Sequence, residues 1–201
     1  KKVCRGLDKN FIDFFKQSRL FTILQDKEIF LGIRNNYINF YYMGASIGKV
    51  EFTKQEPQIS IANKYIKIEN ESGYNKNYTE DIFIADLNKL KQEVSKFQKQ
   101  NGDYEKIAQQ KLVLNNNSNP DSKWYCVDME YVMQRDSSNQ ESYGRFDVIA
   151  ISKEKIDEKH KVALVELKYG SGAYGGFDDK FQEAFKNQTP VKKIGSGILG
   201  H

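Results

Sequence analysis

The chain has 201 residues, of which 39% are hydrophobic and 13% aromatic, enough apolar material for one large domain or for a core with an appended module. Its net charge of +4 permits contact with nucleic acid but does not demand it. No apolar run approaches the roughly 20 residues of a membrane-spanning helix and no secretory signal is visible, so we expect no membrane partner and a cytoplasmic location. The two cysteines, Cys4 and Cys126, stand far apart, which argues against structural zinc and a disulfide framework.

The first part of the chain is expected to form one helix followed by β-structure. Apolar residues at helical spacing predict a helix over residues 7–19, with Asp8 as a cap in its first turn. β-Branched and aromatic residues then predict two to four strands, within residues 28–33, 37–43, 47–53 and 58–68. We expect a turn at residues 44–46 and a polar loop over residues 69–80.

Two helices are expected next. Residues 81–98 carry apolar side chains at helical spacing, and Thr79 provides a start signal just before them. A second helix is expected over residues 104–114, and the Asn-rich run of residues 115–120 should end it.

A three-stranded meander is expected over residues 122–169, followed by a short helix over residues 178–187. This helix and the one over residues 81–98 both need an apolar surface to bury, so they should flank the meander. The expected organisation is a helix with a β-rich module over residues 1–78 and a core over residues 79–201, or one continuous domain. The first residue is not Met, so we expect a piece of a longer protein, truncated at its C-terminus.

The strands of the expected meander carry charges inside apolar runs. Asp147 lies in one run, and Glu166 and Lys168 lie two residues apart in the next. Strand side chains alternate between faces, so Glu166 and Lys168 should project to one side while Val165 and Leu167 face a core. Charges are rare in apolar strands unless a partner compensates for their burial. A divalent cation shared by the two acids would be such a partner; the alternative is an exposed edge strand that forms salt bridges.

A third strand-like run, over residues 124–133, adds two further acids. Strict alternation predicts one apolar face, formed by Tyr125, Val127, Met129, Tyr131 and Met133. Asp128 and Glu130 would share the opposite face with Trp124 and Cys126. Glu130 is the expected additional acid of a site, and Asp128 competes with it for that role.

Polar segments over residues 134–144 and 152–160 are expected to be the loops of the meander. The three strands would then present four charged residues toward one place: Glu130, Asp147, Glu166 and Lys168. Three carboxylates and one ammonium suit an oxygen-liganded Mg²⁺ with a positioned positive charge beside it.

At this point the residues resemble a known family. Asp147, followed by the Glu166-x-Lys168 pair on the next strand, is similar to the signature of the PD-(D/E)xK superfamily of restriction-endonuclease-like nucleases. Phe146 stands where the family name has Pro. The resemblance covers residues 80–201 and implies an α+β (α/β) fold, with a restriction-endonuclease-like core of helix, three-stranded meander, helix and further strand. The N-terminal β-rich part would be an extension of that core.

The resemblance also implies an activity and a site. It implies a metal-dependent nuclease that uses Mg²⁺, with Mn²⁺ as a substitute, to hydrolyse phosphodiester bonds, with DNA as the expected partner. Asp147, Glu166 and the backbone carbonyl of Leu167 would hold the metal, with Glu130 as a further acid through a second metal or a bridging water. Lys168 would orient or activate the attacking water, or balance charge on the phosphate.

Four further residues are weaker candidates for contacts to nucleic acid: Arg145, Gly170, Gly172 and Gln182. Arg145 shares a strand face with Asp147 and either contacts phosphate or pairs with a neighbouring acid. The two glycines either let the backbone approach a phosphate or form a simple turn, and Gln182 is either a contact or a solvated helix residue. The aromatic strands over residues 37–52, with Arg34 and Lys49 nearby, are either a nucleic-acid surface or part of the core.

Two other functions stay open at this stage. One is a nuclease-fold module that binds nucleic acid or a protein without catalysis, against which the intact set of two acids and a lysine argues. The other is an unrelated α+β interaction domain with a solvent-exposed charged strand face, which predicts no site-specific metal binding. The sequence does not choose between DNA and RNA, nor does it give an oligomeric state.

Overall fold

The computed structural model describes residues 6–53, 56–66, 73–132 and 145–168. By its internal contacts the chain divides into two compact units, Lys1–Leu167 and Lys168–His201. The helices and strands of the described residues all belong to the first unit, and Lys168 is the one described residue of the second. The expected boundary between residues 78 and 79 falls at the junction of a strand and a helix inside the first unit.

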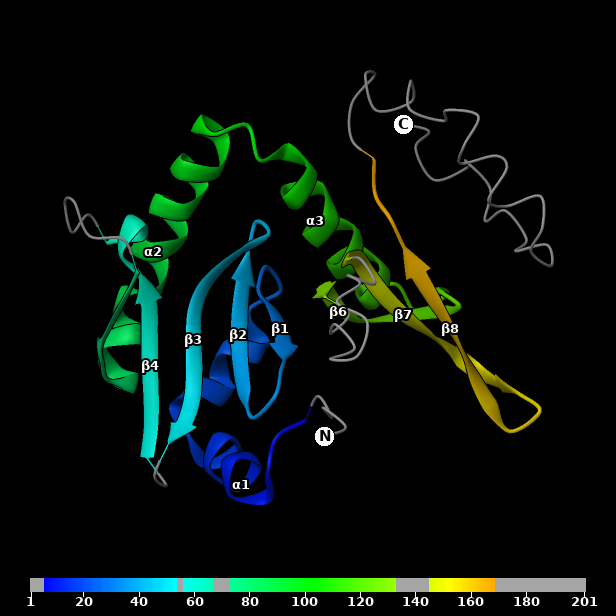
Figure 1. The fold of residues 1–201 in the computed structure, drawn as a ribbon, viewed down its shortest axis with the longest axis horizontal. Helices are drawn as coiled ribbons and strands as arrows, with labels where there is room; N and C mark the ends of the chain where they lie inside the picture. Colours follow the sequence, from blue (N-terminus) through cyan, green and yellow to red (C-terminus); the bar gives the residue numbers. More distant parts are fainter. Residues whose placement is uncertain (1–5, 54–55, 67–72, 133–144, 169–201) are drawn as a thin grey trace, which may run out of the picture. The chain divides into compact units, whose positions relative to one another are not determined.

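The first unit is a mixed α+β fold with two antiparallel sheets (Figure 1). It begins with helix α1 (Lys9–Gln17), and the Asp8 carboxylate caps this helix by accepting a hydrogen bond from the Phe11 backbone N–H at 2.8 Å. A 3-10 helix, η1 (Arg19–Gln25), follows. Both helices bury only one side, which for α1 consists of Phe11 and Phe15, as the helical spacing of its apolar residues predicted.

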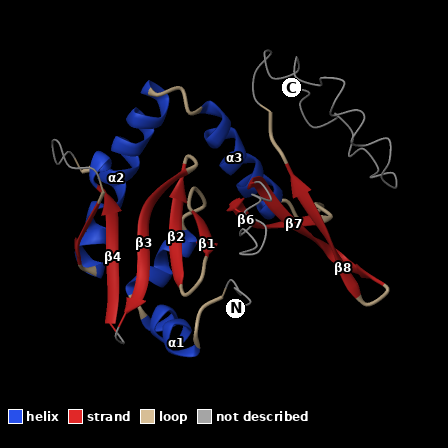
Figure 2. Ribbon diagram, in the orientation of Figure 1, coloured by secondary structure: helices blue, strands red, loops and turns tan. Residues whose placement is uncertain are grey.

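Five strands follow, and each pairs with its neighbour along the chain (Figure 2). They are β1 (Phe30–Ile33), β2 (Tyr37–Tyr42), β3 (Ala45–Thr53), β4 (Glu56–Ala62) and β5 (Tyr74–Tyr78), with a 3-10 turn, η2 (Asn63–Tyr65), after β4. The turn between β2 and β3 contains Gly44 at φ +75°. A Cβ at Gly44 would also overlap the backbone carbonyl of Lys106, so both the local conformation and the packing require glycine there.

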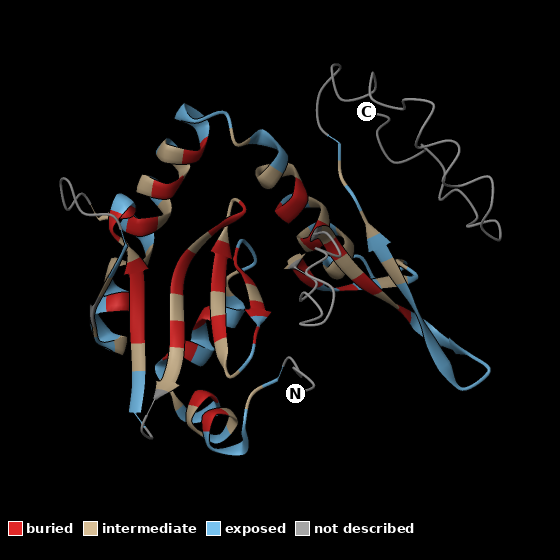
Figure 3. Cartoon of the chain, viewed as in Figure 1, coloured by how far each residue is buried: buried red, intermediate tan, exposed pale blue. Residues whose placement is uncertain are grey.

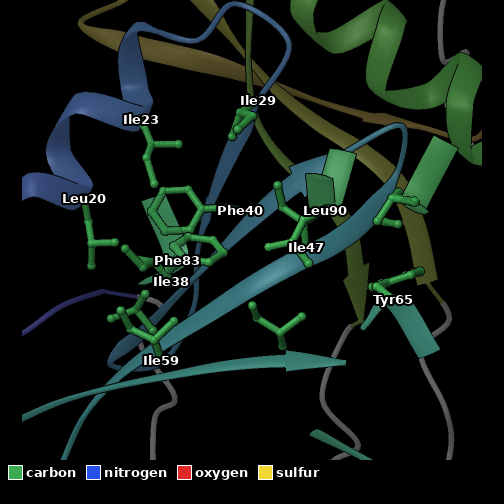
Figure 4. Packing of buried hydrophobic residues seen from close by; sticks show 14 of the residues in the cluster. Leu20, Ile23, Ile29, Ile38, Phe40, Ile47, Ile59, Tyr65, Phe83 and Leu90 are labelled. Atoms are coloured by element: carbon green, nitrogen blue, oxygen red, sulfur yellow. The ribbon is translucent and has the colours of Figure 1, made fainter. Parts of the chain in front are cut away.

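One face of the five-stranded sheet packs against the helices to form the larger hydrophobic core (Figure 4). Ile38 and Phe40 of β2 meet Phe83 and Leu90 of helix α2 (Glu80–Gln100), and Phe40 and Phe83 lie with ring centroids 5.9 Å apart. Because strand residues alternate, the residues between them point to the other face of the sheet. That second face carries the pocket described below.

Two long helices come next. Helix α2 (Glu80–Gln100) begins after Thr79, whose hydroxyl accepts a hydrogen bond from the Ile82 N–H at 3.3 Å, as its start signal predicted. Helix α3 (Tyr104–Ser118) continues through the Asn-rich run that was expected to end it. The reason is tertiary: the side-chain amides of Asn116 and Asn117 donate hydrogen bonds to backbone carbonyls of strand β6 (Trp124–Val132) at 3.0 and 2.9 Å. Within the described part of the chain, no helix combines the length and the apolar character needed to cross a membrane.

The second sheet is the expected three-stranded meander, but its last strand ends before Glu166 and Lys168. Helix α3 packs against this sheet, whereas the helix expected to flank it, over residues 81–98, packs in the larger core instead. The strands of the meander are β6 (Trp124–Val132), β7 (Arg145–Ile156) and β8 (Lys159–Val165), antiparallel in the order β6-β7-β8. Its inner face and α3 form a second hydrophobic cluster, in which Val113, Cys126, Met129 and Val148 are buried.

The expected alternation along β6 is wrong in its first half. Cys126 and Met129 both face the core, whereas Tyr125 and Val127 are 47% and 39% exposed. The pairing of β6 with β7 shifts by one residue between Cys126 and Asp128, which marks a β-bulge. A one-residue shift exchanges the two faces of a strand, so the residues before the bulge point opposite to the predicted direction.

Two expected loops also need correction. The polar segment over residues 69–80 contains strand β5, and the segment over residues 152–160 is largely strand, with a turn only at Asp157 and Glu158. Both turn residues have positive φ, 52° and 61°, as a two-residue hairpin turn requires, but neither is the Gly or Asn that usually signals one. The loop expected over residues 134–144 and the helix expected over residues 178–187 lie outside the described residues.

Candidate active site

The register of the meander brings three acidic residues to neighbouring positions. Glu130 of β6 falls opposite Asp147 of β7, because the residues on either side of Glu130 pair with those on either side of Asp147. The pairing of β7 with β8 ends at Val148 and Val165. The next residues beyond that last pair are Asp147 and Glu166. The three acids therefore occupy one row across the sheet.

Two hydrogen bonds position Asp147. Its Oδ2 accepts a hydrogen bond from the Leu167 backbone N–H at 2.6 Å. Its backbone carbonyl accepts a second bond from the side-chain amide of Gln109, a buried residue of α3. The first bond brings the Glu166–Leu167 peptide to the Asp147 carboxylate, and the second ties this part of β7 to a helix.

The acids lie on the face of the meander that points away from its core. Val148 is buried in the second cluster, and Val165 and Leu167 pack against that cluster, which confirms the predicted direction of these two side chains. By alternation, Asp147 and Glu166 belong to the opposite face. Asp147 is half-buried and Glu166 is exposed. Figure 3 shows that most of β8 is exposed as well, so a large substrate can approach this part of the meander.

Glu130 has an unusual backbone conformation. Its φ of 53° lies in the left-handed region, which few residues other than glycine adopt. Such conformations persist only where the surrounding structure holds them, and they concentrate at functional sites. Glu130 is half-buried, and its position opposite Asp147 makes it the acid nearest in register to the predicted site.

Asp128, the competitor of Glu130, has a structural partner. Its Oδ1 accepts hydrogen bonds from the Arg34 guanidinium and from the Met129 backbone N–H, the latter at 2.8 Å. Arg34 also donates to the Met129 carbonyl at 2.9 Å and to the Tyr41 hydroxyl at 3.0 Å. Of the two alternatives for this region, an exposed nucleic-acid surface does not include Arg34, because its side chain is buried in contacts with β6.

The donor groups of this row fit a hard divalent cation with few protein ligands. Mg²⁺ commonly takes one or two carboxylates together with waters. Asp147 and Glu166 would supply two carboxylates, and the family resemblance implies the Leu167 carbonyl as a third oxygen. Among the residues that the structure describes, no three His, Cys, Asp or Glu side chains form a group that could hold a metal. Glu130 therefore completes no three-acid cage with the other two acids.

The remaining predicted site residues are less fully described. Lys168 directly follows Leu167, is exposed, and is the first residue of the second unit. Arg145 is the first residue of β7, but its side chain is outside the described ones. Gly170, Gly172 and Gln182 lie outside the described residues. Their proposed contacts to nucleic acid stay predictions.

A pocket of about 490 Å³ includes Glu130 in its wall, and about half of its other lining residues lie within residues 37–52, the stretch that the sequence suggested as a possible surface. It lies on the face of the five-stranded sheet opposite the larger core, and alternate residues of β2, β3 and β4 form its floor. Tyr37 and Lys49 were considered as a possible surface, but Lys64, Tyr74 and Lys106 were not. The alternation of polar with buried residues along β2 and β3 was the available signal for the floor. Nothing local marks Lys106, which comes from a helix distant in sequence.

A scan of the chain against protein-family models found no match, and searches of curated proteins and of solved structures found none either. The resemblance to the restriction-endonuclease-like nucleases therefore rests on Asp147 of β7 and on Glu166 and Lys168, which follow the end of β8 at Val165.

Proposed function

We propose that this protein is a metal-dependent nuclease that hydrolyses phosphodiester bonds, with DNA as the expected substrate. The observation that carries the proposal is the 2.6 Å hydrogen bond between the Leu167 N–H and the Asp147 carboxylate. It joins Asp147 of β7 to the peptide between Glu166 and Leu167, just beyond the end of β8. Glu130 lies opposite Asp147 in the register of the sheet and is proposed as an additional acid rather than as part of the same cage.

All the proposed ligands of the metal come from this chain. Bound Mg²⁺, or Mn²⁺ in its place, would supply positive charge at the scissile phosphate and lower the pKa of a water molecule. Asp147 and Glu166 would hold the cation through their carboxylates, and Leu167 through its backbone carbonyl. The hydrogen bond from the Leu167 N–H already restricts the Asp147 carboxylate, so less conformational entropy is lost when a ligand binds there.

Two further side chains have proposed roles in the hydrolysis. Lys168 carries the ammonium group that the family resemblance assigns to the attacking water or to the phosphate charge. Glu130 would accept a proton or hold a bridging water from its position opposite Asp147. Glu166 is exposed, which suits a polymeric substrate that must reach the acids from solution.

The test is isothermal titration with Mn²⁺, combined with cleavage of mixed single- and double-stranded DNA in Mg²⁺ or Mn²⁺. Asp147→Asn and Glu166→Gln keep the size of each side chain but remove its charge. Each should lose most of the metal binding and most of the cleavage. Matched controls are Glu154→Gln and Asp157→Asn, two exposed acids of the β7–β8 hairpin, and both should behave as wild type. Unchanged Mn²⁺ affinity in both site variants contradicts the proposal.

The same experiment separates the alternatives. Binding of DNA without cleavage in either metal identifies a nuclease-fold binding module. The absence of site-specific Mn²⁺ binding in the wild type points to an interaction domain instead. One observation favours the latter: Val162 and Leu164 of β8 are 62% and 55% exposed, on the same face of the meander as Asp147 and Glu166.

A further inference from the structure

The pocket over the five-stranded sheet combines ammonium groups with tyrosine rings. Its volume of about 490 Å³ lies within the ~300–1,000 Å³ typical of small-molecule sites. The lysines that line it are Lys49, Lys64 and Lys106, and tyrosines line it from β2, β5 and the η2 turn. Polar side chains such as Asn39 and Ser46 complete the lining and offer hydrogen bonds.

The floor of the pocket follows from strand alternation. Ile38 and Val50 are fully buried in the larger core. Their neighbours Tyr37, Asn39 and Lys49 therefore point to the opposite face, where they line the pocket. Packing in the core thus holds in place the strands whose opposite face forms the polar floor of the pocket.

Lys64 and Lys106 bring two further positive charges to the pocket, and the Lys64 ammonium lies 4.8 and 4.5 Å from the ring centroids of Tyr65 and Phe97. Burial lowers the pKa of Lys64, the charge of Lys106 lowers it further, and Asp103 opposes both effects. Lys106 lies 3.7 Å from Asp103, at the outer limit of an ion pair. Two ammonium groups that repel one another are stabilised by an anion placed between them.

Lys49, the third lysine of the pocket, already has charged and aromatic partners. Lys49 forms an ion pair with Glu51 at 2.6 Å and lies 4.3 Å from the centroid of the Tyr37 ring. Tyr65 packs edge-on against Phe97. The ring that remains accessible is that of Tyr74 on β5, which is 56% exposed.

We propose that this pocket binds a nucleoside phosphate, with the base stacked on Tyr74 and the phosphate held by Lys64 and Lys106. The ligand is a free nucleotide or one unit of a single-stranded nucleic acid, because bases within a duplex are already stacked and paired. Aromatic stacking combined with lysine contacts to phosphate is the general chemistry of single-strand binding. The link from this pocket to cleavage rests on the proposed nuclease function, since Glu130 belongs both to the pocket wall and to the row of acids. The binding itself does not require that function.

The test measures binding without metal and without cleavage. Fluorescence anisotropy of a labelled oligothymidylate is followed in EDTA, with the Asp147→Asn protein as the parent. Lys64→Gln/Lys106→Gln should weaken binding roughly tenfold or more, and Tyr74→Ala should weaken it by about the ~1–3 kcal/mol of a lost stacking contact, roughly 5- to 150-fold. The control is Lys27→Gln/Lys111→Gln, which removes the same charge from two exposed lysines outside the pocket. It should change the affinity by less than about twofold, and thermal unfolding should verify that each variant is folded.

Competitors distinguish the two sources of the ligand. Displacement of the oligonucleotide by thymidine monophosphate identifies a binding site for a free nucleotide. Displacement only by unlabelled single strand identifies a site for one unit of a longer nucleic acid. Displacement by inorganic phosphate as effective as that by the monophosphate, equal competition by duplex DNA, or equal losses in the pocket and control variants overturns the proposal. Mn²⁺ binding at Asp147 and Glu166 is measured separately, so the nuclease proposal and the pocket proposal fail independently.

Discussion

Arg34 and Asp128 form a buried ion pair that joins the five-stranded sheet to the meander. Each side chain is only 8% exposed. The guanidinium also donates to the carbonyls of Ile33 and Met129 and to the Tyr41 hydroxyl. A buried pair is tolerated when its remaining hydrogen-bonding groups are satisfied in this way. The pair therefore fixes how β6, which carries Glu130, meets the sheet that carries the pocket.

Breaking this pair from one side should be far more costly than removing both partners. Asp128→Leu leaves a buried guanidinium without its counter-charge, so the free energy of unfolding should fall by about 3–5 kcal/mol. The double variant Arg34→Met/Asp128→Leu removes both charges and should be more stable than Asp128→Leu alone. Urea unfolding of Arg34→Met, of Asp128→Leu and of the double variant measures this coupling. Additive losses would show that the two side chains do not stabilise one another.

A second prediction concerns Gln110, which joins α3 to the five-stranded sheet. Its side-chain amide donates to the carbonyls of Glu28 and Tyr41 at 2.8 and 2.9 Å, and its Oε1 accepts from the Gly44 N–H at 2.7 Å. Gln110→Ala leaves these buried groups unsatisfied and should lower the free energy of unfolding by about 3 kcal/mol. Gln100→Ala, at the exposed end of α2, is the matched control and should change it by less than about 0.5 kcal/mol. Equal small effects in both variants would contradict the proposed bridging role.

The sequence predicted the features that depend on short-range chemistry. The caps at Asp8 and Thr79 lie where local signals placed them. Val165 and Leu167 face the core because a regular strand alternates over a few residues. The meander itself was recognisable because each of its strands carries β-favouring residues over a long run.

The features that sequence reasoning missed depend on contacts between distant segments. The β-bulge before Asp128 exchanges the two faces of β6. The buried ion-pair partner of Asp128 is Arg34, which lies 94 positions earlier in the chain. Helix α3 runs through its asparagines because Asn116 and Asn117 bind the backbone of β6. The pocket likewise assembles strands, a turn and a helix that no local pattern connects. Tertiary hydrogen bonds and register shifts, rather than local propensity, therefore determine these features.

Stability at high pH should depend on Tyr65. Burial raises the pKa of Tyr65 to about 12 from its usual 10.0, with smaller contributions from Asp103 and Tyr74. The folded protein then keeps a proton that the unfolded chain releases, so this stabilisation is complete below pH 10 and is lost as the pH rises toward 12. Each pH unit in that window should cost up to about 1.4 kcal/mol of unfolding free energy from this residue.

Tyr65→Phe removes this titration. Denaturant unfolding between pH 9 and pH 12 should give a shallower loss of stability for Tyr65→Phe than for the wild type. Tyr125→Phe, which changes an exposed ring of β6, should keep the wild-type slope. Identical slopes for Tyr65→Phe and the wild type would show that another group dominates in this range.

Cys126 should report on the integrity of the meander. Burial raises the pKa of its thiol, and a hydrogen bond from Asn116 opposes this effect. Because the thiolate is the reactive form, a Cys4→Ser protein should react with a disulfide reagent at pH 8 much more slowly when folded than in denaturant. Reaction at the rate of an exposed thiol in the folded protein would show that this part of the core opens readily.

Lys168 should separate catalysis from metal binding. A protonated amine has no lone pair for a cation, so Lys168→Ala should leave the Mn²⁺ affinity unchanged within about twofold. DNA cleavage should nevertheless fall steeply, by roughly 10²–10⁴-fold, because the water and the developing charge lose the group proposed to align them. Lys168→Arg should not restore full activity, since its larger planar guanidinium cannot act as a base. Glu166→Gln, by contrast, should lose metal binding and cleavage together, while Lys161→Ala, an exposed lysine of β8, should lose neither. If Lys168→Ala cuts DNA as well as the wild type, Lys168 is not catalytic, and any measured cleavage belongs to another site or to a contaminating enzyme.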